Sequence, residues 1–144
     1  MKTTADLIPL FQKKSAQIPQ FIAKKMLDYG LNGLSASHAE ILYYLLREGA
    51  LNMRTISDRI NKDKSTVTAL VHKLISHGYV VRVSCPSDSR VAYIELTKKG
   101  QDLSGVLSSI SSDLMAEFFR PFSKKELYTM HELLTKINVL EAFK

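Results

Sequence analysis

Residues 63–77 read DKSTVTALVHKLISH, and this stretch decides the fold that the sequence predicts. Its apolar residues recur at helical spacing, which predicts one helix over residues 64–77 with a buried side made of Val67, Leu70, Val71 and Leu74. The opposite side carries small and polar residues, namely Ser65, Thr68, Ala69 and His72, flanked by Thr66 and Lys73. Such short side chains would let the helix enter the roughly 12 Å major groove of DNA and reach base edges. The alternative is an ordinary amphipathic helix whose exposed hydroxyls have no function.

A shorter helix and a hairpin are expected on either side of this stretch. Asn52 can cap a short helix with Ile56 and Ile60 on one side, and Asp63 can cap the helix that follows. Two short helices joined by a tight turn form a helix-turn-helix. Residues 79–84 and 90–96 are rich in Val, Ile and Tyr, and turn residues separate them. This pattern predicts a two-stranded hairpin, or wing.

Helical periodicity also covers the first part of the chain. Residues 5–29 predict a long first helix with Thr4 available as a cap, which Pro19 should kink or split because it lacks an N–H and its ring needs space. Ser35 can cap a second helix that Gly49 ends, because glycine adopts the left-handed conformation found after helices. Ser37 and Glu40 offer a competing capping box for that helix.

The last part of the chain predicts two more helices. Thr97 can cap a long helix that Pro121 breaks, and Ser123 with Glu126 forms a capping box for a final helix. The final helix carries an apolar stripe of Leu127, Met130, Leu134 and Ile137. A chain of this length has little to cover all of these stripes, so a symmetric interface with a second copy is expected.

The positive charge of the chain is concentrated in its middle. The net charge is +6, and residues 51–100 hold nine Lys or Arg against four Asp or Glu, which gives +5 for that segment. Clustered positive charge is typical of a phosphate-binding surface, and a merely solvated surface is the alternative. Arg54, Lys62 and Lys64 are the candidate phosphate contacts, together with the free N–H groups at the start of the helix over residues 64–77.

The predicted wing carries a second candidate site. Arg90 lies near its tip, and Asp88 is two residues earlier. An arginine gains from the negative potential of a narrow minor groove, and a nearby carboxylate can hold the guanidinium in place. The alternative is a salt-bridged loop without a partner.

The order and spacing of several short motifs resemble those of MarR-type transcriptional regulators. The resemblance covers about residues 34–100 and rests on the run from Asp63 to Val71, on Gly78-Tyr79-Val80, on Arg82, on Asp88-x-Arg90 and on Leu96-Thr97-x-Lys99-Gly100. It implies a mainly α fold with a small β-hairpin wing. It also implies a winged helix-turn-helix DNA-binding domain at residues 34–97 and a helical dimerisation region at residues 1–33 and 98–144.

This resemblance also implies a function. We expect a homodimer that binds a pseudo-palindromic operator in double-stranded DNA as a repressor, with Ser65, Thr66 and Thr68 where the family reads bases and Arg90 where its wing enters the minor groove. A small-molecule effector, phenolic or similar, is expected to release the DNA, but the sequence does not identify the residues that bind it. Aromatic residues could line such a pocket or could be ordinary packing: Tyr43, Tyr44, Phe118, Phe119 and Phe122.

Other classes of protein fit the sequence poorly. No catalytic constellation, cofactor motif or metal-ligand spacing is present, so neither an enzyme nor a metal site is expected. The longest apolar run, residues 41–46, is far shorter than the roughly 20 residues of a membrane span, and a cytoplasmic protein without membrane association is expected. A redox role for the single cysteine, Cys85, stays open. A winged helix used as a protein-interaction module is the alternative from another class.

Overall fold

The computed structural model describes residues 3–139 and residue 141 of the chain. Its helices are η1 (Thr4–Asp6), α1 (Leu7–Ser15), α2 (Gln17–Asp28), α3 (Ala36–Glu48), α4 (Met53–Ile60), α5 (Lys64–Ser76), α6 (Lys98–Gln101), α7 (Ser104–Phe119) and α8 (Lys124–Thr135). Its strands are β1 (Leu51–Asn52), β2 (Val80–Cys85) and β3 (Asp88–Leu96). The chain divides into two compact units, Met1–Ile110 and Ser111–Lys144. The predicted mainly α fold with a small β wing is confirmed.

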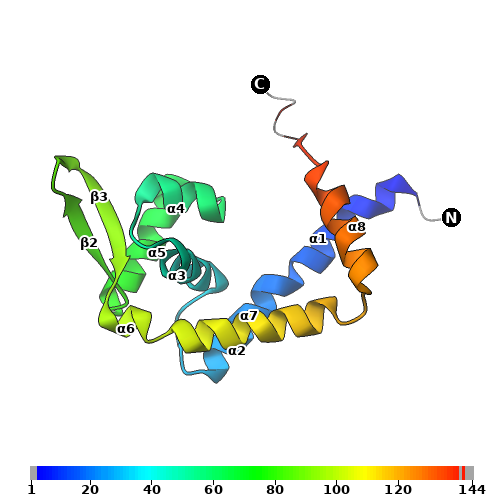
Figure 1. The fold of residues 1–144 in the computed structure, drawn as a ribbon, viewed down its shortest axis with the longest axis horizontal. Helices are drawn as coiled ribbons and strands as arrows, with labels where there is room; N and C mark the ends of the chain where they lie inside the picture. The colour runs from blue at the N-terminus through cyan, green and yellow to red at the C-terminus, as the bar shows by residue number, and fades with distance from the viewer. Residues whose placement is uncertain (1–2, 140, 142–144) are drawn as a thin grey trace. The chain divides into compact units, whose positions relative to one another are not determined.

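The first unit contains a winged helix-turn-helix. Helices α3, α4 and α5 lie beside the β2–β3 hairpin, as Figure 1 shows. The sheet has three antiparallel strands in the order β1-β3-β2, with Leu51 opposite Ile94 and Val80 opposite Leu96. The sequence predicted only the two hairpin strands. Strand β1 was missed because two residues are too few to show an alternating pattern.

The core of this unit comes from the apolar stripes of the three central helices. Buried residues include Ile41, Leu42 and Leu45 of α3, Ile56 and Ile60 of α4, and Val67, Val71 and Leu74 of α5, with Ile94 of β3. Leu46 and Leu70 are half-buried against this cluster. The stripes predicted from helical spacing are therefore the core, and the opposite side of α5 is left to solvent.

The turn of the hairpin is shorter than the sequence predicted. Strand β2 continues to Cys85 and β3 begins at Asp88, so these two residues face each other across Pro86 and Ser87. The register shifts between Ser84 and Cys85. Cys85, Asp88 and Ser89, which the sequence predicted for the turn, are therefore part of the strands. The irregular register at this point accommodates them.

Pro19 splits the first predicted helix, but upstream of its own position. α1 ends at Ser15 and α2 begins at Gln17. A proline ring clashes with the carbonyl four residues before it, which here belongs to Ser15, and this places the break at that residue. The start of the helical segment also differs, because Thr3 and not Thr4 caps it, and the Asp6 carboxylate accepts hydrogen bonds from the Thr3 backbone and hydroxyl.

The long helix expected after Thr97 is interrupted early. Thr97 caps the short α6, accepting a hydrogen bond from the Gly100 N–H at 3.1 Å, and α7 begins only at Ser104. Gly100 is buried, and a Cβ at this position would lie 2.1 Å from the carbonyl oxygen of Tyr79. Only glycine can lie this close to the carbonyl oxygen, and Gly100 therefore lets α6 pack directly against the chain at Tyr79.

The second unit contains the last part of α7 and all of α8. The predicted capping box at the start of α8 is present, because Ser123 Oγ accepts from the Glu126 N–H at 3.2 Å and the Glu126 carboxylate accepts from the Ser123 N–H at 2.8 Å. Hydrogen bonds to its carboxylate from the Ser123 backbone, and then from the Ser123 side chain, lower the pKa of Glu126. Among the residues that the structure describes, no helix has the length and apolar composition needed to cross a membrane.

Candidate nucleic-acid interface

The start of α5 is held by its predicted cap. Asp63 has extended backbone angles, and its Oδ1 accepts a hydrogen bond from the Thr66 N–H at 2.7 Å. The same carboxylate accepts hydrogen bonds from the side chains of Thr66 and Ser65, and these bonds lower its pKa. The cap therefore stays ionised near neutral pH and fixes the first turn of the helix.

The predicted groove face of α5 is open to solvent. Ser65, Thr66, Ala69, His72 and Lys73 are exposed, and Thr68 is half-buried. The hydroxyls of this face are occupied within the chain, because Ser65 Oγ donates to Asp63 Oδ1 at 3.1 Å and Thr68 Oγ1 donates to the Lys64 carbonyl at 2.8 Å. Helical periodicity predicted the exposure of these side chains, but it could not show where their hydroxyl protons go.

The three predicted phosphate contacts are cations at the surface of the chain. Arg54, Lys62 and Lys64 are all exposed. Lys62 lies close enough to Glu40 and to Asp63 for its positive charge to lower the pKa of each carboxyl, although burial raises the pKa of Glu40 overall. Part of the positive potential of Lys62 is therefore cancelled within the chain. Lys64, in the first turn of α5, is the better-placed cation beside the free N–H groups.

The Lys73 amine lies near Gly33. A Cβ built on Gly33 would lie 3.7 Å from its Nζ, and its positive charge acts on His38 of α3. Lys73 was predicted as a flank of the recognition surface. Its amine instead lies near the segment that leads into α3.

The wing presents an ordered arginine. Arg90 Nε donates to Asp88 Oδ1 at 3.1 Å, and its Nη2 donates to Asp88 Oδ2 at 3.2 Å. The Arg90 N–H also donates to Asp88 Oδ1, at 3.0 Å, and these hydrogen bonds lower the pKa of Asp88. The Arg90 side chain is nevertheless 89% exposed, so a fixed cation stands in solvent beside the turn.

A clamp at the far end of α5 was not predicted from the residues themselves. The three carbonyls that follow α5 each accept a hydrogen bond: His77 O from Lys99 Nζ at 2.8 Å, Gly78 O from Thr97 Oγ1 at 2.6 Å, and Tyr79 O from the Thr97 N–H at 3.0 Å. The Lys99 amine also lies 4.7 Å from the centre of the Tyr79 ring. We call this group, Thr97 and Lys99 with Gly100, the α5 clamp.

The clamp gives a physical meaning to a motif noted in the sequence. Leu96-Thr97-x-Lys99-Gly100 supplied part of the family resemblance, but no local pattern indicates that its donors reach back 19 and 22 residues. Its effect is to hold the chain that directly follows α5, because the carbonyls of residues 77–79 accept hydrogen bonds from Lys99 and Thr97.

His38 is a buried polar group behind this interface. It is 5% exposed, and its Nδ1 accepts from the Ser35 N–H at 2.8 Å, so it takes the place of the usual Glu or Gln in a capping box. Its Nε2 is buried without a hydrogen-bond partner. Burial, and then the charges of Lys73 and His77, hold the pKa of His38 below its ordinary value of 6.5.

Cys85 lies half-buried at the wing turn, with its Sγ 3.1 Å from Ser87 Oγ. Hydrogen bonds from Ser87 and from the Asp88 backbone lower the pKa of the thiol. The cause of this shift is therefore the hydrogen bonding of the turn itself. In the described part of the chain, no three His, Cys, Asp or Glu side chains come together as a metal site would require.

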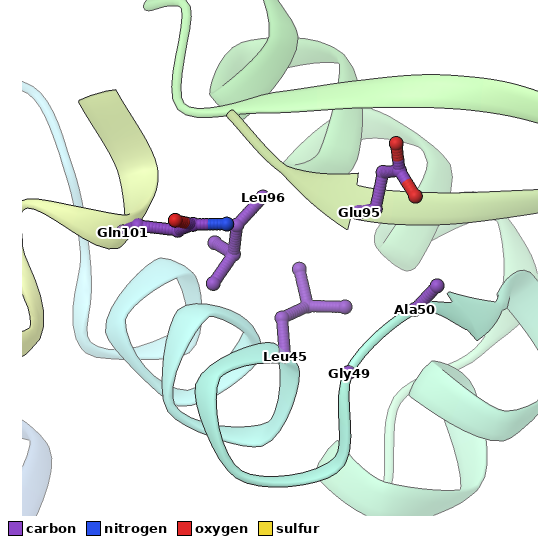
Figure 2. Close-up of a pocket in the computed structure, with 6 residues that line it drawn as sticks. All are labelled: Leu45, Gly49, Ala50, Glu95, Leu96 and Gln101. Carbon is purple, nitrogen blue, oxygen red and sulfur yellow. The ribbon is translucent and has the colours of Figure 1, made fainter. Parts of the chain in front are cut away.

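A pocket of about 260 Å³ lies between the end of α3 and the end of β3. Figure 2 shows the six residues that line it: Leu45, Gly49, Ala50, Glu95, Leu96 and Gln101. None of the aromatic residues considered for an effector pocket lines it. Tyr43 and Tyr44 pack edge to face with each other, as do Phe118 and Phe119.

The chain matches known proteins in both sequence and fold. Residues 32–91 match the model of the MarR family. The HTH-type transcriptional regulator SarZ of Staphylococcus epidermidis is 35% identical over 98 residues, which is 67% of this chain and 66% of that relative. The chain thus spans slightly less than two thirds of the relative's length.

Two solved structures have the same fold. A MarR transcriptional regulator from Methanosarcina mazei Go1 superposes with a TM-score of 0.79 at 25% identity, covering 92% of this chain and 96% of that one. MepR of S. aureus, solved as a DNA complex, gives a TM-score of 0.79 at 22% identity, covering 94% and 96%. By its motifs, its fold and its relatives, the chain belongs to the MarR family of winged-helix proteins.

Proposed function

We propose that the chain is a transcriptional regulator that binds double-stranded DNA in a sequence-specific manner, with α5 in the major groove and Arg90 in the adjacent minor groove. The observation that carries the proposal is the open face of α5. Its side chains from Ser65 to His72 are short, its first turn is fixed by Asp63, and Lys64 stands where a phosphate would meet the helix N-terminus. Arg54 and Lys62 would add contacts to the DNA backbone.

The wing supports the same proposal. Arg90 is held by Asp88 through two hydrogen bonds along one edge of its guanidinium and is still largely exposed, so little conformational entropy would be lost when it enters a groove. Arginine is favoured in narrow minor grooves by their negative potential. The name of the relative SarZ and the DNA complex of MepR agree with this proposal.

We propose further that the working form is a homodimer on a pseudo-palindromic operator, with the winged domain at residues 34–97 and the dimerisation region at residues 1–33 and 98–144. Large apolar side chains of α1 and α8 are exposed in the single chain, among them Leu7, Ile8, Phe11, Tyr128, Leu133 and Leu134. A two-fold interface would cover the same surface on both copies. It would also set two α5 helices about one DNA turn apart, roughly 34 Å.

DNA binding is tested by fluorescence anisotropy with duplexes that the purified chain enriches from a random pool. Enriched duplexes should bind more tightly than random ones, and affinity should fall steeply as salt rises, because each neutralised phosphate releases counterions. Arg90→Ala should weaken binding without changing the circular dichroism spectrum. Arg47→Ala, near the end of α3, is the matched arginine control, because Arg47 is also exposed and hydrogen-bonded within the chain. A protein-interaction module is the second candidate, and failure to bind any duplex would favour it over DNA binding.

The dimer is tested by analytical ultracentrifugation. Wild type should sediment as a dimer at micromolar concentration, and Leu133→Asp on α8 should sediment as a monomer, because a charge in an apolar interface lacks a partner. Tyr43→Asp, which changes another exposed position, on α3, serves as the control. A monomeric wild type would contradict the proposed dimer but not DNA binding itself.

Repression in the cytoplasm and release by a phenolic or similar small molecule complete the proposal. Their test is the anisotropy assay repeated with salicylate as the probe, together with a reporter gene placed behind the selected duplex. Release of the duplex and derepression of the reporter are the expected results. A reporter that is activated by the chain would contradict the assignment as a repressor.

A further inference from the structure

The hydroxyl groups on the first two turns of α5 are already used as donors. Ser65 donates to the Asp63 carboxylate, which also accepts from the Thr66 side chain, and Thr68 donates to the Lys64 carbonyl at 2.8 Å. A hydroxyl has one proton, so each of these groups meets a partner outside the chain only with its lone pairs. Redirecting one of them to a base would leave the Asp63 carboxylate or the Lys64 carbonyl with one bond fewer.

Methyl groups are the other feature of this surface. Ala69 is exposed and offers a methyl group and nothing else, and half-buried Thr68 adjoins it with its own methyl group. Thr66 contributes a third methyl on the flank. His72 carries a ring N–H, so hydrogen-bond donation from this face comes from its far end and not from its centre.

This combination of acceptors and methyl groups is selective in the major groove. Thymine presents a methyl group there, and its partner adenine presents an amino group that needs an acceptor. Guanine presents two acceptors, N7 and O6, which the occupied hydroxyls of Ser65, Thr66 and Thr68 do not satisfy. Both pairs present an amino donor to this face, but only the A·T pair adds a methyl group, and guanine opposes two acceptors to the acceptors of the face where adenine opposes one.

We propose that Thr68 and Ala69 determine base specificity by packing their methyl groups against the 5-methyl group of thymine, so that α5 selects A·T pairs and rejects guanine beneath it. This inference rests on the proposed DNA binding, because it specifies what the same helix reads. Thr68 contributes through its methyl group, while its hydroxyl remains part of the helix.

The test replaces single thymines by uracil, which removes only the 5-methyl group. The probe is the duplex that the wild-type chain enriches from a random pool, made with thymine and then with uracil at one position at a time. At one or two positions in each half-site uracil should weaken binding about fourfold, the factor that corresponds to burying one methyl group. In the enriched duplexes, guanine should be absent from the positions directly next to the responsive thymines.

Three variants locate the effect. Thr68→Ser keeps the hydroxyl and removes the methyl, so at the responsive position thymine and uracil should bind alike. Ala69→Gly removes the neighbouring methyl and should have the same result at its own position. Thr68→Val keeps a methyl and loses the hydroxyl, so its sensitivity to uracil should persist. Thr129→Ser is the matched control, because Thr129 of α8 donates in the same way to the carbonyl four residues before it.

The outcomes separate the inference from the function on which it rests. If no duplex binds, the proposed function fails. If duplexes bind but uracil has no effect at any position, or if the effect survives in both Thr68→Ser and Ala69→Gly, the methyl contact is refuted while DNA binding stands. Enrichment of guanine at the positions under α5 would refute it as well.

Discussion

The central helices and the outer helices treat their apolar residues in opposite ways. Ile41, Leu42 and Leu74 of α3 and α5 are fully buried within one chain, whereas Phe11 of α1 is 55% exposed and Leu134 of α8 is 42% exposed. Both sets follow the same helical spacing in the sequence. The difference is what surrounds them: α3, α4, α5 and the sheet cover one another, and the described residues do not cover α1 and α8 to the same extent.

This contrast indicates which part of the molecule is self-sufficient. A fully buried side chain contributes to the free energy of unfolding of a single chain, but an exposed one contributes only when something else covers it. The stability of the winged region should therefore depend little on protein concentration, whereas the stability of the outer helices should depend on it strongly.

The largest effect is expected from the core. Leu42→Ala should lower the free energy of unfolding by about 2–5 kcal/mol, because it leaves a cavity at a fully buried site. Leu133→Ala, the matched change on α8, should weaken self-association and change unfolding at high dilution by less than about 0.5 kcal/mol. Urea denaturation at two protein concentrations measures both. Equal losses at every concentration would remove the distinction between the two regions.

The next largest effect on stability is expected at two glycines, Gly100, which is buried, and Gly105, which is exposed. Gly100→Ala should destabilise the chain by about 1–3 kcal/mol, because the added methyl group would overlap the Tyr79 carbonyl. A Cβ on Gly105, in α7, meets nothing within 4 Å, so Gly105→Ala should stabilise its helix by up to about 1 kcal/mol. Thermal unfolding of the two variants should shift in opposite directions. A Gly100→Ala variant as stable as wild type would show that the clamp is not tight.

His38 should make the winged region sensitive to acid. Its pKa is below 6.5 in the folded chain, so the unfolded chain binds the proton first as the pH falls. Its contribution is fully present above pH 6.5 and should decline below it, with a slope of at most about 1.4 kcal/mol per pH unit. His38→Gln should flatten the dependence of stability on pH between 5 and 6.5, because glutamine can complete the capping box without titrating. An unchanged pH profile in this variant would assign the effect to other groups.

The smallest effects are expected at helix caps. Asn52→Ala should cost about 1 kcal/mol, because Asn52 Oδ1 accepts from the Thr55 N–H at 2.8 Å in the winged region. Ser123→Ala removes a comparable cap from α8, and its cost should appear in helicity by circular dichroism and in self-association more than in the unfolding of the core. If Ser123→Ala lowers the stability of the dilute chain as much as Asn52→Ala does, α8 belongs to the same cooperative unit.

Much of the fold could be predicted because its signals are local. The caps at Ser35, Asn52, Asp63 and Ser123 lie within a few residues of the helices that they begin, and the buried stripes follow one period. The break between α6 and α7 was not predicted, and the close contact of Gly100 with Tyr79 just before it joins residues that are far apart in the sequence. Strand β1 depends in the same way on β3.

The site was predictable in its exposure and not in its chemistry. Periodicity placed Ser65, Ala69 and His72 on the open side of α5, but the proton of each hydroxyl is directed by neighbours whose geometry only the fold defines. The two lysines behave similarly. Lys62 and Lys73 are exposed as expected. The charge of Lys62, however, acts on the carboxyl of Glu40, and the amine of Lys73 lies near Gly33.

The α5 clamp ties the orientation of a helix to the segment that leads into another one. Only Asp102 and Leu103 separate α6 from α7, so a rotation at the start of α7 would be transmitted through short hydrogen bonds to the carbonyls that follow α5. A tilt of α5 pivoting at this end is largest at its opposite tip, where Lys64 and Ser65 lie. A small movement far from the duplex would therefore be amplified where the helix would first meet it.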